Sequence, residues 1–350
     1  MKKILFTGGG SAGHVMPNVA LMEELISLGK TDLGYIGTDG IEKQILAKYN
    51  LPYMQIQCPK LVRGGGFSVL KRNLGIPLAF HRAVQQATAH LKAWQPDLVF
   101  SKGGYVALPV VFAAKKLRIP CLAHESDFSP GLANRLSAKK CRRIFTSFPE
   151  TAAVLKNGKF SGAPLRHSLF EVNRDEARKQ LGFSKTDKVL LVFGGGSGSV
   201  AINQALRNQL KELCSRYVIL HVCGRGNLVQ SRLKNYHQTE FIADMGMAYA
   251  AADGVIARSG AGTVFEILAL KKRALFIPLI GQTRGDQQQN AAYFQKRGLC
   301  HVLEQNKLEN LSKAVDDLFA DNGLKKALKD CSFTCGNQII LQEIRSILKI

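Results

Sequence analysis

The sequence predicts an α/β protein of two parallel-sheet domains, and three observations support this. Short, wholly apolar segments alternate with amphipathic helical segments, as in parallel sheets covered by helices on both faces. A strand, a triple glycine, a serine and an amphipathic helix occur at 2–25 and again, almost in register, at 188–210. The chain of 350 residues is also longer than one hydrophobic core usually serves.

The first half contains six apolar segments that are short enough to be buried strands. Helical periodicity lies between them, with apolar side chains recurring every three to four residues. The alternation predicts a doubly covered parallel sheet. The predicted strands are 3–7, 33–37, 54–57, 98–101, 120–123 and 143–147, and the predicted helices are 18–28, 41–49 and 78–94.

A break at 161–164, Ser-Gly-Ala-Pro, separates this half from a second one that is organised in the same way. Its predicted helices are 174–181 and 201–213, and its predicted strands are 189–193, 217–223, 254–257, 274–277 and 300–303. The tail, 337–350, has one apolar helical face, which we expect to pack on the first domain, with the second domain as the alternative. The expected domains are 1–163 plus 337–350, and 164–336.

The charge balance indicates polyanionic partners. The chain has 48 Lys and Arg against 26 Asp and Glu, a formal net charge of +22. Such a charge suits nucleic acid, an anionic membrane surface or phosphorylated substrates. No stacking aromatic residues or known binding motif accompany it, so nucleic acid is not expected. The longest apolar run, 105–114, is too short for a membrane span, which makes any membrane contact peripheral.

Eight cysteines are scattered without CxxC pairs, and no histidine lies near Cys331 and Cys335 to complete a zinc set. We therefore expect ordinary thiols in a reducing cytosol and no metal site. No signal peptide is visible, because the chain enters a strand directly after Met1.

The first glycine loop, residues 8–13, joins a strand to a helix start, where unpaired N–H groups suit a phosphate or a developing anion. The spacing of Gly8, Gly10 and Gly13 matches the dinucleotide fingerprint, for which Asp39 could bind the ribose. His14 follows directly and is the only titratable side chain of the loop. It could serve as a neutral base or merely bond to a neighbouring loop.

Three stretches of the second half suit a nucleotide sugar. The second glycine loop, 194–199, lacks the Lys-Ser/Thr of a P-loop but is still typical of an anion-contacting turn, with a tight strand–helix connection that binds no ligand as the alternative. Thr263 and Glu266 follow a strand and could meet a phosphate and the two ribose hydroxyls, or they could form a capping box that needs no ligand. The amides at 287–290 suit sugar hydroxyls, with a solvated helix start as the alternative.

Polar residues follow three strands of the first half. They are His14, the Gly103-Gly104-Tyr105 turn and the acidic turn His124–Asp127. Because parallel sheets bind ligands at the carboxyl ends of their strands, we expect these three groups to converge.

Residues 60–82 mix apolar and basic side chains in a glycine-rich loop and the helix after it. Apolar side chains there could enter a bilayer while cations meet anionic headgroups, and Lys139–Arg143 could add charge. The alternative is a loop followed by an ordinary buried helix. We define the predicted membrane patch as Phe67, Leu70, Lys71, Arg72 and Leu74.

Six motifs in this order resemble the MurG family over nearly the whole chain. They are GGGSAGHVMPNVAL (8–21), GGYV (103–106), HESDFSPGLAN (124–134), SGAPLR (161–166), RSGAGTVFE (258–266) and DQQQNA (286–291). The resemblance implies a GT-B fold, with two Rossmann-like domains facing across a cleft and the last helix crossing back to the first. The GGGSGS loop, Asp127 and Asp286 depart from the pattern common in this family.

The MurG family comprises peptidoglycan N-acetylglucosaminyltransferases. The resemblance implies inverting, metal-independent transfer of GlcNAc from UDP-GlcNAc to the MurNAc 4-hydroxyl of lipid I, giving lipid II. No cofactor is expected. The implied place is peripheral, at the cytoplasmic face of the cell membrane, with lipid I, an anionic membrane surface and other cell-wall enzymes as partners.

The resemblance also assigns site residues. Ile242 would pack near uracil, Glu266 would hold the ribose, and Gln287 would read the sugar. The catalytic candidates are His14 and its rival Glu125. Further donor contacts are expected at Ser11, Ala12, Gly13, Asp127, Arg166, Ser197, Ala261, Gly262 and Thr263, and acceptor contacts at Gly9, Gly10, Gly103, Gly104 and Tyr105.

Other functions remain open from the residues alone. A related GT-B transferase could use another lipid acceptor, such as diacylglycerol. A dinucleotide-dependent oxidoreductase rests only on the glycine fingerprint, and a non-catalytic basic module rests only on the charge.

Overall fold

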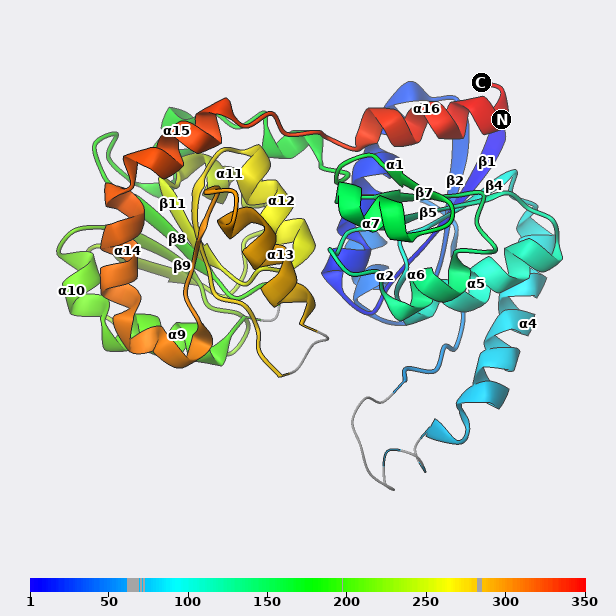
Figure 1. Ribbon diagram of the computed structural model, residues 1–350, viewed down its shortest axis with the longest axis horizontal. Coiled ribbons are helices and arrows are strands. Elements are labelled where there is room, and N and C mark those ends of the chain that lie inside the picture. The colour runs from blue at the N-terminus through cyan, green and yellow to red at the C-terminus, as the bar shows by residue number, and fades with distance from the viewer. Residues whose placement is uncertain (62–68, 70, 72, 197, 282–284) are drawn as a thin grey trace. The chain divides into compact units, whose positions relative to one another are not determined.

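A computed structural model describes residues 1–61, 69, 71, 73–196, 198–281 and 285–350. They form two compact units, Met1–Arg166 with Thr334–Ile350, and His167–Phe333 (Figure 1). The sequence analysis placed the two domain boundaries after residue 163 and before residue 337, and the structure places them after Arg166 and before Thr334. Each unit contains one all-parallel sheet, so the predicted fold class of two parallel-sheet α/β domains is confirmed.

The N-terminal unit has a seven-stranded sheet with the order β3-β2-β1-β4-β5-β6-β7. Its order reverses between β1 and β4, and loops at such a switch point form the usual ligand site of a parallel sheet. The strands are β1 (Lys2–Thr7), β2 (Thr31–Gly37), β3 (Tyr53–Gln55), β4 (Leu98–Ser101), β5 (Cys121–Glu125), β6 (Arg143–Thr146) and β7 (Gly158–Phe160).

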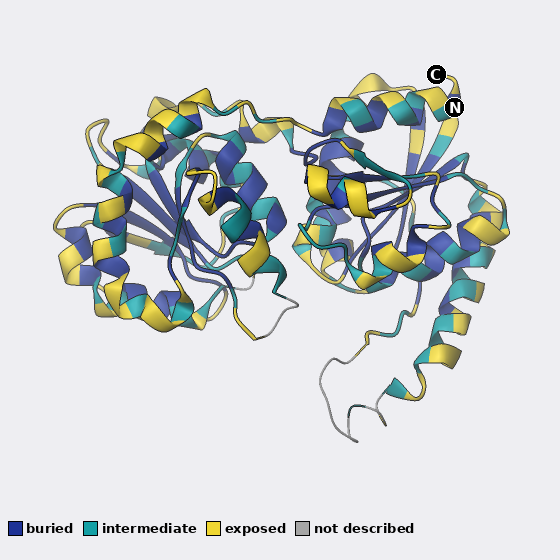
Figure 2. Cartoon of the chain, in the orientation of Figure 1, coloured by how far each residue is buried: buried dark blue, intermediate teal, exposed yellow. Residues whose placement is uncertain are grey.

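Both faces of this sheet are covered because alternate strand residues point to opposite sides. Ile4 and Phe6 pack with α1 and α16, whereas Leu5 faces α4 and α5. The central strands β4 and β5 are accordingly buried at every residue, and β1 and β2 along most of their length, whereas the short edge strands β3 and β7 are half-buried or exposed (Figure 2). The helices are η1 (Ala12–His14), α1 (Met16–Leu28), α2 (Ile41–Leu46), α4 (Ile76–Trp94), α5 (Gly104–Lys116), α6 (Leu132–Ser137), α7 (Pro149–Val154) and α16 (Asn337–Leu348).

The tail helix α16 is part of the N-terminal unit. It lies beside α1 (Figure 1), and Ile340, Ile344 and Leu348 belong to the same buried cluster as side chains of α1. Asn337 fastens the start of the helix, because its side-chain amide accepts from Leu165 N–H at 2.9 Å and donates to Leu165 C=O at 2.8 Å. The side chain thus replaces the backbone partners that Leu165 would need in a sheet.

The C-terminal unit has a six-stranded sheet with the order β10-β9-β8-β11-β12-β13. Its strands are β8 (Val189–Phe193), β9 (Val218–Val222), β10 (Tyr236–Thr239), β11 (Gly254–Ala257), β12 (Arg273–Phe276) and β13 (His301–Val302). Its helices are η2 (His167–Leu169), α8 (Arg174–Leu181), α9 (Val200–Asn208), α10 (Leu210–Cys214), α11 (Met245–Ala251), α12 (Ala261–Ala269), α13 (Asp286–Gln295), η3 (Gln305–Asn310), α14 (Leu311–Ala320) and α15 (Asn322–Asp330).

An ion pair between a buried arginine and a partly exposed aspartate closes the amino-terminal end of this second sheet. Arg178 of α8 is fully buried and donates to Asp253 Oδ2 at 2.6 Å and to Ala251 C=O at 3.0 Å. Asp253, just before β11, also accepts from Val189 N–H at 2.8 Å, at the start of β8. Burial acts to raise the pKa of Asp253, but hydrogen bonds from Arg174 and Val189 and the charge of Arg178 outweigh it and hold the pKa below its ordinary value.

The predicted elements differ from the structure in several places, and helices α5, α6, α7, α11, α14 and α15 were not among those predicted. Strands β7 and β10 were not predicted, because both are short edge strands and β10 is largely polar. The helix predicted over 201–213 is divided at Gln209, whose side-chain amide donates to Leu308 C=O and accepts from Ser312 N–H. In the ranges that the structure describes, no helix combines the length and hydrophobicity that a membrane span needs.

Candidate active site

The first glycine loop leaves β1 and leads into the short turn η1. Tyr35 O–H donates to Gly8 C=O at 2.7 Å, which fixes the start of the loop from β2. His14 ends η1, two residues before α1, and is half-buried. Ser11 Oγ lies 2.9 Å from His14 Nδ1, so the imidazole is oriented by its own turn.

The predicted acceptor residues meet in this unit. A Cβ on Gly10 would lie 2.4 Å from Tyr105 Cε1, so the aromatic ring packs directly on the loop backbone. A Cβ on Gly104 would lie 2.9 Å from Gly9 C=O and 3.4 Å from the His14 ring. The structure therefore brings the loop, His14 and the start of α5 together, and Gly103 is the residue that caps α5.

The acidic turn after β5 is held tightly from within. Glu125 is only 4 % exposed, and its carboxylate accepts from Asp127 N–H at 3.0 Å, Gly131 N–H at 2.7 Å and Asn134 Nδ2 at 2.9 Å. Asn134 also lies against Gly103, which connects this turn to the loop after β4. The Glu125 carboxylate therefore organises the turn.

His124 and Lys102 are buried beneath the same strand ends. Burial and the charge of Lys102 hold the pKa of His124 well below its ordinary value, so this imidazole is neutral at pH 7. Its Nε2 lies 3.2 Å from Gly162 C=O, which makes it a donor there. Burial lowers the pKa of Lys102 below its ordinary value, and the charges of Glu125 and Asp127 offset only part of this effect.

In the C-terminal unit, Thr263 and Glu266 lie on α12, which begins at Ala261 with Gly260 as its cap. The capping-box alternative is therefore wrong, because Thr263 is the third residue of the helix. Both side chains are half-buried, and Tyr249 O–H donates to Glu266 Oε2 at 3.0 Å. The first N–H groups of α12 and the Glu266 carboxylate thus lie on one short helix that follows β11.

The Arg258-Ser259-Gly260 and Asp286–Asn290 motifs contact one another. Ser259 Oγ donates to Gln287 C=O at 2.8 Å, and Asn290 Nδ2 donates to Ser259 C=O at 3.3 Å. The side-chain oxygen of Gln287 accepts from Leu279 N–H at 3.0 Å. Gln287 is thus tied to the chain end after β12, rather than belonging to a fully solvated helix start.

Arg258 is a residue of this site that the sequence analysis did not select. It is buried, and it donates to Ile277 C=O at 3.1 Å, to Ser199 Oγ at 2.9 Å and to Gln305 Oε1 at 2.7 Å. It thereby joins the ends of β11 and β12 to the second glycine loop. The sequence signal that could have identified Arg258 is its position directly after an apolar strand.

The remaining predicted donor residues divide between the units. Ile242 is half-buried in the loop between β10 and α11. Ser197 lies outside the described residues. Arg166 is the last residue of the N-terminal unit before the crossing, and Ser11, Ala12, Gly13 and Asp127 belong to that unit as well.

The predicted membrane patch is described only in part. Phe67, Leu70 and Arg72 lie outside the described residues, Lys71 is exposed and Leu74 is 71 % exposed. The first turns of α4 project from the unit with exposed and half-buried residues (Figure 2), and Leu78 there is 58 % exposed. The alternative of an ordinary buried helix therefore holds only for the later turns, where Ala83, Ala87 and Leu91 are buried.

The exposed start of α4 continues onto α5. Phe80 packs edge-on against Phe112 with ring centroids 5.3 Å apart. Lys140 Nζ lies 4.0 Å from the Phe112 ring centroid, a cation–π contact. Apolar and cationic side chains therefore share this surface.

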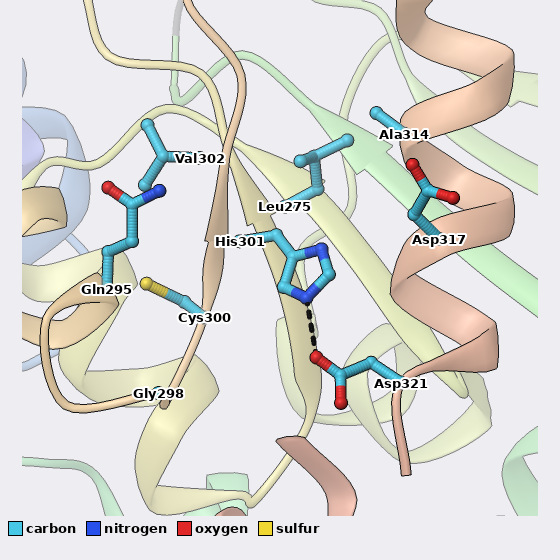
Figure 3. Close-up of a pocket in the computed structure, with 9 residues that line it drawn as sticks. All are labelled: Leu275, Gln295, Gly298, Cys300, His301, Val302, Ala314, Asp317 and Asp321. Atoms are coloured by element: carbon cyan, nitrogen blue, oxygen red, sulfur yellow. Dashed lines mark hydrogen bonds and ion pairs between the residues drawn. The ribbon is translucent and has the colours of Figure 1, made fainter. Parts of the chain in front are cut away.

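A cavity of about 410 Å³ in the C-terminal unit lies among β12, β13, α13 and α14 (Figure 3). His301 Nε2 faces Asp321 Oδ2 at 2.9 Å there, and Asp321 also caps α15 by accepting from Leu324 N–H at 2.8 Å. None of the lining residues was predicted for the site, and the hydrogen bond between His301 and Asp321 serves to attach α15. Across the described part of the chain, no group of three or more His, Cys, Asp or Glu side chains could hold a metal ion.

Comparison with known proteins agrees with this arrangement. Residues 4–146 match the glycosyltransferase family 28 N-terminal domain, and residues 189–344 match the corresponding C-terminal domain. The MurG structure from Acinetobacter baumannii superimposes with a TM-score of 0.75 and 26% identity, covering 99% of this chain and 100% of that one. The calicheamicin glycosyltransferase CalG4 shares the fold, with a TM-score of 0.73 at 16% identity over 100% of this chain and 98% of that one.

Curated relatives are similar along most of their length. An enzyme from Clostridium perfringens strain SM101 is 42% identical over 325 residues, 90% of each chain. One from Clostridium botulinum strain Kyoto is 42% identical over 333 residues, 93% of each chain. Both are named UDP-N-acetylglucosamine–N-acetylmuramyl-(pentapeptide) pyrophosphoryl-undecaprenol N-acetylglucosamine transferase. The chain therefore belongs to the MurG family of N-acetylglucosaminyltransferases, within glycosyltransferase family 28.

Proposed function

We propose that the protein transfers GlcNAc from UDP-GlcNAc to the 4-hydroxyl of the MurNAc unit of lipid I, with inversion at the anomeric carbon, and so makes lipid II. The observation that carries this proposal is the α12 unit. Its free N–H groups and the Tyr249-held carboxylate of Glu266 lie on one helix, as a nucleoside diphosphate requires. The names of the curated relatives support the same reaction.

The C-terminal unit would bind the donor. Glu266 accepts hydrogen bonds from the two ribose hydroxyls, while Ala261, Gly262 and Thr263 face the phosphates. Ile242 packs near uracil, and Gln287 reads the sugar. The positive end of α12 stabilises the charge on departing UDP, so the proposed reaction requires no metal ion.

The N-terminal unit would bind the acceptor and supply the base. His14 takes the proton of the MurNAc 4-hydroxyl as its oxygen attacks the anomeric carbon, and the bond to the UDP oxygen breaks. We prefer His14 to Glu125 because His14 is partly accessible, whereas the Glu125 carboxylate is buried and already accepts three hydrogen bonds.

The surface formed by Lys71, Leu74, the start of α4 and Lys140 would bind the cytoplasmic face of the membrane, where a polyprenyl-linked acceptor resides. Leu74 and Leu78 supply apolar contact, and Lys71 and Lys140 supply charge for anionic headgroups. This attachment is peripheral, and its partners are anionic lipid and the acceptor itself.

The decisive experiment is transfer of radiolabelled GlcNAc from UDP-GlcNAc to a soluble lipid I analogue, with diacylglycerol present as a competing acceptor. We expect label on the lipid I analogue alone. Label on diacylglycerol would assign the enzyme to another lipid acceptor, and no transfer to either would reject the proposed function.

A further inference from the structure

Glu42 is a buried carboxylate at the first glycine loop that the mechanism above does not use. It lies on α2, directly after β2, and is 0 % exposed. Its Oε2 accepts from Gly10 N–H at 3.1 Å, and its Oε1 accepts from Thr38 N–H at 2.9 Å and from the Thr38 hydroxyl. An ionised carboxylate is the strongest acceptor that a protein can offer to such donors.

The loop fits closely around this carboxylate. A Cβ on Gly9 would lie 2.5 Å from the Glu42 carboxyl carbon, and a Cβ on Gly10 would meet Tyr105 on the other side. Only glycine leaves room for the loop between the two side chains. Burial first, and then the charge of Glu42, raise the pKa of Tyr105, so its phenol stays protonated beside the carboxylate.

The carboxylate therefore takes a place that a bound anion has in other glycine loops. The Gly10 N–H, which a dinucleotide pyrophosphate would need, already has a partner within the protein. The acid that the fingerprint interpretation selected, Asp39, is instead 68 % exposed and pairs with Lys43 at 2.6 Å.

One short turn connects Gly10 to His14, so the backbone orientation at Gly10 affects the position of His14. Gly10 is followed by Ser11, whose hydroxyl lies 2.9 Å from His14 Nδ1. The backbone N–H of His14 also donates to Ser11 C=O at 3.1 Å. A change in the peptide plane at Gly10 would therefore move the Ser11 hydroxyl beside the imidazole and the Ser11 carbonyl that holds the His14 backbone.

We propose that Glu42 is a positioning residue for the acceptor: its carboxylate holds the Gly10 N–H and thereby keeps the glycine loop and His14 in the conformation that receives the acceptor sugar. The inference rests on the proposed function, because it assigns the loop to the acceptor. It adds that the loop is preorganised by an internal anion before any ligand binds.

The test is Glu42→Gln, which keeps the size of the side chain but makes one oxygen an amide donor that faces Gly10 or Thr38. We expect the KM for the lipid I analogue to rise about ten- to hundredfold while the KM for UDP-GlcNAc stays within about twofold. Asp39→Asn is the matched control, because it removes the same charge three residues earlier from an exposed pair. It should leave both KM values unchanged.

A second measurement does not depend on turnover. Amide hydrogen exchange in the segment 8–15 should become faster in Glu42→Gln but not in Asp39→Asn. If Glu42→Gln does not fold, Glu42→Asp keeps the charge, withdraws it by one methylene, and should show the same change at smaller size.

The outcomes separate the two proposals. If the wild-type protein shows no transfer, the proposed function fails, and faster exchange in Glu42→Gln still supports an internal anion at the loop. If the wild-type protein transfers GlcNAc but Glu42→Gln changes neither the acceptor KM nor the exchange of segment 8–15, the positioning role is overturned. Equal increases in the KM values for UDP-GlcNAc and for the lipid I analogue would also overturn it, since they would indicate a general structural role.

Discussion

Replacement of Glu266 by alanine tests the donor site most directly. The carboxylate is half-buried on α12, and Tyr249 O–H holds its Oε2 at 3.0 Å, so it is presented in one orientation. A hydrogen bond to a charged group contributes about 1.5–3 kcal/mol. Loss of two such bonds to the ribose, each at the lower end because water competes, predicts a loss of about 3 kcal/mol. This is about a hundredfold in Kd for UDP-GlcNAc.

Calorimetric titration of UDP-GlcNAc measures this change without turnover. Tyr249→Phe is the graded companion, because it removes only the hydroxyl that orients Glu266 and leaves the buried ring against Phe193. We expect it to weaken donor binding by about three- to tenfold. An unchanged Kd in Glu266→Ala, with the unfolding temperature preserved, would refute the assignment of Glu266 to the ribose.

Three further predictions concern the base, the second sheet and the membrane. His14→Ala should lower turnover with a lipid I analogue by ~10²–10⁴-fold, and a loss below about tenfold would exclude a base. Asp253→Ala removes the carboxylate that pairs with the buried Arg178 and should lower the free energy of unfolding in urea by about 1.5–3 kcal/mol, because Arg178 keeps its hydrogen bonds to backbone carbonyls. Because folding lowers the pKa of Asp253, the free energy of unfolding of the wild type should exceed that of Asp253→Ala above pH ~4, and this difference should shrink as the pH falls further. A difference that stays constant with pH would contradict this. Leu78→Ser with Lys71→Ser should reduce flotation with anionic liposomes, and unaltered flotation would place the membrane contact elsewhere.

Much of the fold followed from local patterns. Short apolar runs identified β1, β4, β8 and β11 closely, because the part of a strand that is buried on both faces is mostly apolar. The repeated strand-glycine-helix unit predicted two sheets of one kind. The order of six motifs then identified the family, which the comparisons confirm.

Local patterns failed where an element depends on partners. Strand β10, with the sequence Tyr-His-Gln-Thr, has no apolar run and is a strand only because β9 offers it hydrogen bonds. Gln209 divides one predicted helix because its amide bonds to residues about a hundred positions later. Neither contact leaves a periodicity in the nearby sequence.

The sequence by itself determined the two-sheet architecture, the family and the residues from which a site could be assembled. The tertiary structure decided what those residues do locally. It buried the Glu125 carboxylate among three hydrogen-bond donors of its own turn, an environment that the local sequence does not reveal. It also placed Glu42, and not Asp39, against the first glycine loop. Spacing along the chain limits which groups can meet, but only packing decides which carboxylate loses its water and must accept hydrogen bonds from the backbone.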